Sequence, residues 1–343
     1  MADSLGERAR LKKELLVFIA LTFGITYAFQ LAVFSIAGPY TRESAPFWNP
    51  TLSMGMLIPA LAAIVCLILF KSPAVTRESL IVFGVFILAG AAYILGTVYA
   101  VDAIRYAGPL GMFVIIVLNL KKEWRTGLLG AKLSFGKNFR YYLLVPAILL
   151  ALLILSYSLN VWAGLGAPEI QYSPGLFLSI FLPGLLVSFF IGWVAFFGEE
   201  FGWRGYLQDR LFPLFGGYKG VLVLGIIWGL WHSVLIILGY NYPGQPLIGN
   251  VLMILFTILA GIIFSYAVLK TGSIWIAVLL HMIIDFTDPL ASSYLSSSTD
   301  PILSFGTGLF GIAILGVFAA VLLRSKVWTD EVAVVPDGEG VTR

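Results

Sequence analysis

The residues best suited to chemistry are ionisable side chains that interrupt an otherwise apolar sequence. They are two adjacent glutamates, an arginine, both histidines of the chain and an aspartate: Glu199, Glu200, Arg204, His232, His281 and Asp285. An ionisable side chain inside a bilayer costs at least about 2.5 kcal/mol, so it persists mainly where it faces protein and performs a task. We therefore expect these six side chains to form one functional site.

The spacing of these residues indicates which of them act together. Side chains four positions apart are neighbours on one face of a helix. This rule joins Glu200 to Arg204 as an ion pair, and it joins His281 to Asp285.

Two further patterns surround this set. Trp228 lies four residues before His232, so its indole can pack against the imidazole and restrict its rotamer. Gly198 and Gly202 form a small-xxx-small pair, which lets a neighbouring helix approach the glutamates closely. The predicted site is therefore dry and crowded.

Such a constellation suits the activation of water. A carboxylate in apolar surroundings binds protons more tightly than in water and can act as a general base, while a nearby cation keeps a second carboxylate ionised. A neutral imidazole can orient the water, and the remaining imidazole and carboxyl group can donate hydrogen bonds to a developing oxyanion. This chemistry is amide hydrolysis without a serine or cysteine nucleophile.

A metal site is the alternative use of the same groups. Glu199, His232 and His281 supply the two imidazoles and one carboxylate of a three-ligand catalytic zinc site. The H-E-x-x-H motif of many zinc peptidases is absent from the sequence. Whether zinc takes part is left open by the residues.

The elements that carry these residues are predicted to be membrane helices. Of the 343 residues, 59% are hydrophobic and 11% are charged, whereas a soluble domain has about a quarter charged residues. Apolar runs of about 20 residues, long enough to span a bilayer, recur along the chain. We expect an all-α polytopic bundle of about eight to ten membrane helices, with spans at 14–37, 51–70, 80–101, 103–120, 141–165, 175–197, 220–239, 249–269, 273–290 and 303–323.

The helix that carries the glutamates has two alternative placements. We favour one continuous helix from near Pro183 through Gln208, which places both carboxylates inside the membrane; an end near residue 197 would leave them at the cytoplasmic rim. Counting 1.5 Å per residue from the cytoplasmic ends places His281 roughly 12 Å deep, and His232 and Asp285 roughly 18 Å deep. We expect a cavity that opens to the cytoplasmic side.

The distribution of Lys and Arg predicts the orientation, because basic residues stay in short cytoplasmic loops. With a cytoplasmic N-terminus, 19 of the 21 basic residues lie on the cytoplasmic side, and Arg42 and Arg105 lie outside. We expect an integral protein of the cytoplasmic membrane, if the source is prokaryotic, with both termini and the basic loop 121–140 in the cytoplasm. Segments 38–50 and 240–248 then face outward. The net charge of +3 requires no nucleic-acid partner.

Three regions follow from these patterns. Residues 1–140 hold the N-terminal membrane helices and the basic loop, and residues 141–323 hold the C-terminal membrane core with the motifs at 199–285. Residues 324–343 are mixed in charge and are expected to be a flexible cytoplasmic tail.

The motifs resemble a known family, the CPBP intramembrane proteases, also called Abi or CAAX-protease-like proteins. The family pattern of Glu-Glu-xxx-Arg, aromatic-xxx-His and His-xxx-Asn or Asp is found in order as E-E-F-G-W-R (199–204), W-G-L-W-H (228–232) and H-M-I-I-D (281–285). The resemblance covers roughly residues 180–290. It implies a hydrolase that cleaves a membrane-associated or lipidated protein or peptide among membrane lipids.

The resemblance also implies a role for each matching residue. Glu199 would activate the water with His232 as its partner, and His281 and Asp285 would stabilise the oxyanion or assist with a metal, as in a metalloprotease. Glu200 and Arg204 would hold the glutamate helix in place. Two positions depart from the common pattern: Trp228 stands where Phe is common, and Asp285 stands where many members have Asn. An ionised aspartate cannot donate to an oxyanion, so Asp285 must be protonated or must orient His281.

Three other functions are weighed against proteolysis. The first is a non-proteolytic immunity or interaction member of the same family that retains the polar cluster. The second is a proton-coupled transporter that uses the carboxylates and histidines as a relay, although the sequence shows no internal repeat. The third is a haem protein with His232 and His281 as axial ligands, in which the glutamate pair would have no use.

Overall fold

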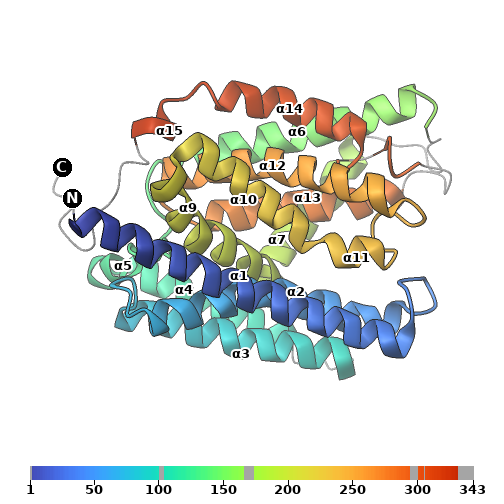
Figure 1. Ribbon diagram of the computed structural model, residues 1–343. Helices are drawn as coiled ribbons and strands as arrows, with labels where there is room; N and C mark the ends of the chain where they lie inside the picture. Colours follow the sequence, from blue (N-terminus) through green and yellow to red (C-terminus); the bar gives the residue numbers. More distant parts are fainter. Residues whose placement is uncertain (1, 100–103, 166–173, 294–299, 305, 331–343) are drawn as a thin grey trace.

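The protein is helical throughout the part that the structure describes. This computed structural model describes residues 2–99, 104–165, 174–293, 300–304 and 306–330, and these residues include no strand (Figure 1). The predicted all-α polytopic fold is confirmed. The helices are α1 (Ala2–Ala37), α2 (Ala45–Leu69), α3 (Arg77–Tyr99), α4 (Ile104–Leu120), α5 (Lys122–Leu128), α6 (Tyr141–Trp162), α7 (Pro174–Ile191), α8 (Trp193–Glu200), the π-helix η1 (Phe201–Leu207), α9 (Gln208–Phe215), α10 (Gly217–Trp231), α11 (Ser233–Ile237), α12 (Pro246–Thr271), α13 (Trp275–Ser293), α14 (Leu309–Leu322) and α15 (Val327–Asp330).

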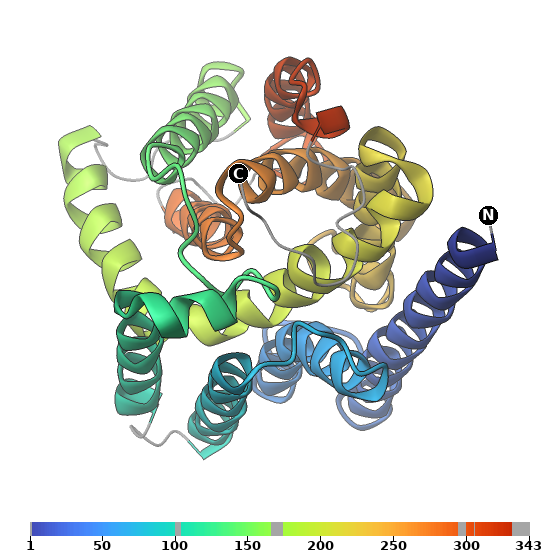
Figure 2. The ribbon, with the colours of Figure 1, turned by 90° about the vertical axis from the view of Figure 1, so that its left-hand side faces the viewer.

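The long helices lie roughly side by side and form a bundle around three interior elements. Viewed from one end, α8, α12 and α13 lie inside a ring formed by helices such as α1, α3, α6, α7 and α14 (Figure 2). Burial agrees with this arrangement, because every residue of η1 is buried. The interior helices are also those that carry the glutamates and His281. The bundle therefore places the polar motifs at its centre.

The lengths of the helices show which of them can cross a bilayer. Five are long and apolar enough, and a sixth span results if the bent pair Ser179–Ile191 and Trp193–Phe215 counts as one. Four shorter apolar helices of 10–17 residues occupy other predicted spans. The protein is thus an integral membrane protein, but by length alone fewer helices qualify than the eight to ten expected. The five long spans are Gly6–Ala37, Ala45–Leu69, Arg77–Tyr99, Tyr141–Trp162 and Pro246–Thr271.

The predicted continuous helix from Pro183 through Gln208 is wrong. The helix breaks at Gly192, and the segments on either side are bent by 71°. Glycine is a poor helix former, and Gly108 of α4 approaches the carbonyl oxygen of Ile191 so closely that an added Cβ would lie 2.4 Å from it. The glutamates nevertheless lie inside the bundle, at the end of the short helix α8.

Part of the predicted tail 324–343 is helical. Helix α15 packs by the buried side chains of Val327 and Trp328, and Trp328 Nε1 donates to the carbonyl oxygen of Leu322 at 2.9 Å. Residues 331–343 lie outside the described part of the chain.

The predicted close approach at Gly198 and Gly202 is present, and α2 is the helix that makes it. A Cβ at Gly198 would lie 2.3 Å from the carbonyl oxygen of Met56, and one at Gly202 would lie 2.4 Å from Pro59 Cβ. Both contacts involve backbone or a rigid ring, so an added methyl group could be accommodated only by a shift of the α2 backbone. The two glycines fix the distance between α2 and the glutamate-bearing segment.

Replacement of Gly198 by Ala should destabilise the protein, because the added methyl group overpacks a contact with the backbone of α2. We expect a loss of about 1–3 kcal/mol and a lower melting temperature in detergent. The matched control is Gly84→Ala, also inside a helix but with open space around its Cβ position, which should be neutral or slightly stabilising. Equal melting temperatures for the two variants would contradict this account.

Candidate active site

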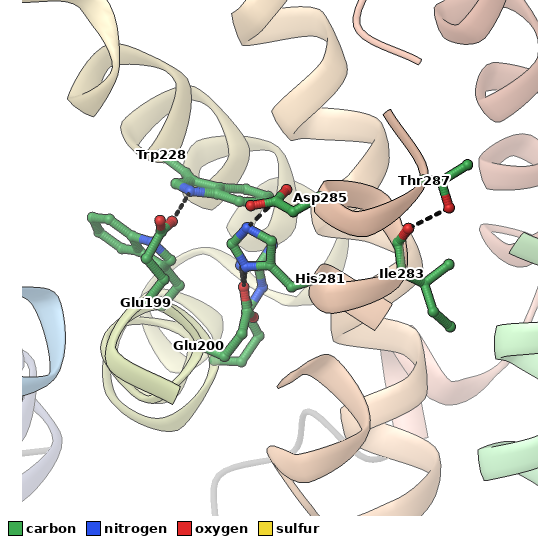
Figure 3. Close-up of polar contacts among 9 residues, drawn as sticks. Glu199, Glu200, Trp228, His281, Ile283, Asp285 and Thr287 are labelled. Carbon is green, nitrogen blue, oxygen red and sulfur yellow. Dashed lines mark hydrogen bonds and ion pairs between the residues drawn. The ribbon is translucent and has the colours of Figure 1, made fainter. Parts of the chain in front are cut away.

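A buried ion pair lies at the centre of the site. Arg204 Nη1 is 2.9 Å from the Glu200 carboxylate, and neither side chain is exposed to solvent. The Nδ1 atom of His281 lies 2.8 Å from Oε1 of the same carboxylate (Figure 3). The predicted pair of Glu200 with Arg204 is therefore present, and Glu200 has a second partner that helical spacing did not reveal.

The Arg204 guanidinium is held in place by aromatic rings. Its central carbon lies 4.2 Å from the Trp228 ring centroid and 4.9 Å from that of Phe264. A desolvated cation over an aromatic face gains about 2 kcal/mol or more. Arg204 belongs to η1, and π-helical turns are frequent at functional sites. The distribution of Lys and Arg assigned Arg204 to the basic residues on the cytoplasmic side. That assignment is wrong, since Arg204 lies in the protein interior.

Two indoles orient the Glu199 carboxylate. Its Oε2 atom accepts hydrogen bonds from Trp228 Nε1 at 2.9 Å and from Trp203 Nε1 at 3.3 Å. Sequence reasoning gave Trp228 only a packing role and gave Trp203 none. The spacing of four between Glu199 and Trp203 could have identified the second donor, whereas the bond from Trp228 joins different helices.

His232 lies at the junction of α10 and α11. Its Nδ1 atom is 2.9 Å from the Trp228 carbonyl oxygen. A carbonyl oxygen only accepts, so Nδ1 carries the proton and Nε2 of the neutral ring is an acceptor. The ring centroid lies 6.1 Å from that of Trp228, the predicted partner, and 4.9 Å from that of Trp231. Both indoles restrict the imidazole.

His281 and Asp285 are on one helical face, as their spacing predicts. His281 Nε2 lies 3.7 Å from Asp285 Oδ1, an ion-pair separation that is too long for a hydrogen bond. The Asp285 side chain is 44% exposed, so at this position the prediction of a dry and crowded site is wrong. It is accessible because it faces a cavity.

One cavity of about 500 Å³ brings the predicted residues together. Its lining includes Glu199, His232, His281, Asp285 and the indole of Trp228. Glu200 and Arg204 lie behind this lining and are fully buried. The structure thus separates four groups that can meet a substrate from two that support them.

The predicted metal ligands do not fit a metal as they are arranged. No three His, Cys, Asp or Glu side chains among the described residues are grouped so as to hold an ion. We derive no step through a metal.

The direction in which the cavity extends differs from the expected one. Its lining includes Gln30, Thr51, Asn241 and Thr307, which belong to the last turns of α1, the first turns of α2, the connection between α11 and α12, and the segment before α14. These segments lie at the end of the bundle opposite α5 and α15 (Figure 1). The basic loops lie at the end with α5 and α15. The cavity therefore does not open at the end to which the sequence assigned the cytoplasm.

Comparisons with known proteins point to the same residues. The family described as Rce1-like, type II CAAX prenyl endopeptidase Rce1-like, matches residues 180–287, which include the whole polar cluster. A CAAX prenyl protease 2 from Methanococcus maripaludis is 32% identical over 179 residues, which are 50% of this chain and 63% of the relative. The match thus spans less than two thirds of the relative's length.

Removal of one partner of the central ion pair should destabilise the protein more than removal of both. Arg204→Met leaves the Glu200 carboxylate buried without its guanidinium counter-charge and with His281 as its remaining partner, so we expect a loss of about 3–5 kcal/mol and a low folded yield from membranes. The double variant Glu200→Gln/Arg204→Met removes both charges, so its yield and melting temperature in detergent should exceed those of Arg204→Met. A double variant that is no more stable than the single one would contradict the assignment.

The two indole donors should contribute unequally to the site. Trp228→Phe keeps an aromatic ring beside Arg204 but removes the shorter hydrogen bond to Glu199, so we expect a loss of stability of about 1.5–3 kcal/mol, the contribution of a hydrogen bond to a charged group. Trp203→Phe removes the longer bond and should destabilise the protein less. The measurement is the melting temperature of each variant in detergent, and a larger decrease for Trp203→Phe would refute the ranking.

Proposed function

We propose, from the similarity of residues 180–287 to the Rce1-like family and of half of the chain to a CAAX prenyl protease 2, that this protein is an intramembrane endopeptidase of the CPBP, or CAAX-protease-like, family with a glutamate-activated water. The observation that carries the proposal is the Glu199 carboxylate, which faces a cavity within the membrane bundle beside two histidines. A carboxylate held in this way by two indole donors has one oxygen, Oε1, left for water.

In the proposed reaction Glu199 removes a proton from water, and the oxygen of that water attacks the carbonyl carbon of the scissile peptide bond. The carbonyl π electrons move to oxygen and form an oxyanion. When the tetrahedral intermediate collapses, the C–N bond breaks and the proton held by Glu199 passes to the leaving amine. His232 supports the first step, because its Nε2 acceptor can orient the water.

His281 is proposed to stabilise the oxyanion. Glu200 accepts from Nδ1–H, and a protonated ring then carries Nε2–H near the cavity and Asp285. The Arg204 charge balances Glu200, so Glu200 can orient His281 without leaving an unpaired negative charge. Asp285 orients the same ring from the other side. The sequence gave Glu200 only a structural role; in this proposal it also positions His281.

The proposed substrate is a membrane-associated or lipidated polypeptide. The name of the matched relative refers to prenylated proteins, and a cavity inside a membrane bundle favours a substrate that is already at the membrane. Six of the residues that line it are apolar side chains from α2, α11, α12 and α13: Leu52, Met56, Leu235, Met253, Phe256 and Ile284. Cleavage on the cytoplasmic side, which the sequence predicted, requires a cavity that opens there.

Glu199→Gln tests the proposal directly. It should abolish proteolysis, with a rate loss of about 10² to 10⁴, in a protein that inserts and melts like the wild type. The measurement compares membrane proteomes of a strain that lacks the protein after complementation with wild type or variant, and the same uncleaved species should persist in both the deletion and Glu199→Gln strains.

Glu200→Gln is the matched variant one residue away. It should lower both activity and stability, because it leaves Arg204 without its buried counter-charge. A Glu199→Gln protein that still cleaves at the wild-type rate would end the proposed mechanism, whereas a folded Glu199→Gln protein that fully protects or binds its partner would favour an immunity or interaction role. An active Glu199→Gln beside a stable, inactive Glu200→Gln would show that the two carboxylates have exchanged roles.

A further inference from the structure

We infer that the site receives its substrate from the non-cytoplasmic side of the membrane, so that its substrates are exported or outward-facing, membrane-anchored polypeptides. The substrate class rests on the proposed peptidase function, whereas the side of access does not. Three observations carry the inference: where the basic residues lie, where the cavity reaches the surface, and what closes its other end.

The basic residues gather at one end of the bundle. Direct contacts join segments far apart in sequence there: Arg210 pairs with Glu14 at 3.0 Å, and Asn138 Nδ2 donates to the Lys270 carbonyl oxygen at 2.8 Å. The loops between α2 and α3 and between α4 and α6 meet at the same end (Figure 1). The basic side chains of this end are Arg8, Arg10, Lys12, Lys13, Lys71, Arg77, Lys121, Lys122, Arg125, Lys132, Lys137, Arg140, Arg210, Lys219, Lys270, Arg324 and Lys326.

The cavity reaches the surface at the other end. Loops at this rim brace one another: the Tyr40 N–H donates to the Leu238 carbonyl oxygen at 2.7 Å, and Tyr242 Oη donates to the Thr307 carbonyl oxygen at 2.8 Å. The lining residues at this end are uncharged. Tyr240, Asn241, Pro301 and Thr307 are partly or fully exposed and form the rim, and the buried Gln30 and Thr51 lie deeper. Among the described basic side chains, only Arg42 lies at this end.

Packed side chains close the path from the site to the basic end. The chain runs from Glu200 through η1 toward Arg210, and every residue of η1 is buried. Beyond it, Lys132 Nζ donates to the Arg204 carbonyl oxygen at 3.2 Å and forms an ion pair with Asp209. Trp275 Nε1 donates to the Leu133 carbonyl oxygen at 2.8 Å. This layer separates the cavity from the basic loops.

The asymmetric distribution of basic residues then determines which end of the bundle faces the cytoplasm. Short loops rich in Lys and Arg remain on the cytoplasmic side during insertion, and the inverted orientation would require translocation of the whole basic end. With the basic end in the cytoplasm, the uncharged rim faces outward. A substrate that enters through this rim meets Glu199 and both histidines without crossing the basic layer.

Cysteine labelling of the protein in bacterial membranes tests the inference. The single native cysteine, Cys66, is buried and is replaced by Ser. Thr307→Cys and Asn241→Cys mark the rim, and Lys137→Cys and Lys326→Cys mark the basic end. A membrane-impermeant maleimide should modify both rim cysteines in intact spheroplasts, and it should modify the basic-end cysteines only after the membrane is permeabilised.

The reverse pattern, with rim cysteines modified only after permeabilisation, would overturn the inference. Failure to modify either rim cysteine from either side of a folded protein would also overturn it, because the cavity would then be closed to water. A second readout uses a bulky maleimide on Thr307→Cys, which should lower cleavage at least tenfold when added outside, while modification of Lys137→Cys leaves cleavage unchanged.

The labelling pattern is independent of catalysis, so it should be the same in a Glu199→Gln background. Outward labelling in a protein that cleaves nothing would support the access route and count against the proposed function. Labelling of the rim cysteines only from the cytoplasmic side, in an active protease, would support the proposed function and count against the access route.

Discussion

The buried ion pair between Glu200 and Arg204 is the constraint on which the site depends. Two unexposed charges inside a membrane protein are tolerated mainly where each has a counter-charge. Glu200 is paired with Arg204 and His281. Arg204 is paired with Glu200 through Nη1, and its guanidinium lies over the rings of Trp228 and Phe264, while its Nε and Nη2 atoms have no hydrogen-bond partner among the described residues. These partners come from α8, η1, α10, α12 and α13. The pair therefore draws the helices together, and in doing so it sets the positions of Glu199 and the histidines.

The backbone geometry allows these helices to pack closely around the ion pair. The break at Gly192 redirects the chain so that α8 enters the bundle, and η1, which follows α8 directly, places Arg204 against Glu200 at the end of α8. Gly198 and Gly202 let α2 lie against the opposite face of this segment. A side chain at either glycine would push α2 away and enlarge the cavity whose wall α2 forms through Thr51, Leu52 and Met56.

Local features of the site could be predicted from the sequence, and features that depend on packing could not. The pairs Glu200–Arg204 and His281–Asp285 follow from helical spacing, and the close approach at Gly198 follows from residue size. The glycine at 192 is a weak local signal for the break, but the close approach of Gly108 in α4 to the Ile191 carbonyl oxygen is a property of the packed bundle. The bond from Trp228 to Glu199 joins two helices and has no local signal. The same holds for the exposure of Asp285 and for the end at which the cavity opens, because both are properties of the assembled bundle.

The one-sided cavity also reconciles two demands on a membrane hydrolase. Hydrolysis consumes water, so a water path must reach Glu199 from one surface. A water path that continued to the other surface would cross the membrane next to a row of proton-exchanging groups, and such rows are the means by which transporters relay protons. The buried η1 segment and the contacts of Lys132 interrupt this path on the basic side. The same packed layer that holds Arg204 against Glu200 thus separates the cavity from the basic end of the bundle, which is a reason for the two charges and the barrier to lie in one continuous segment of the chain.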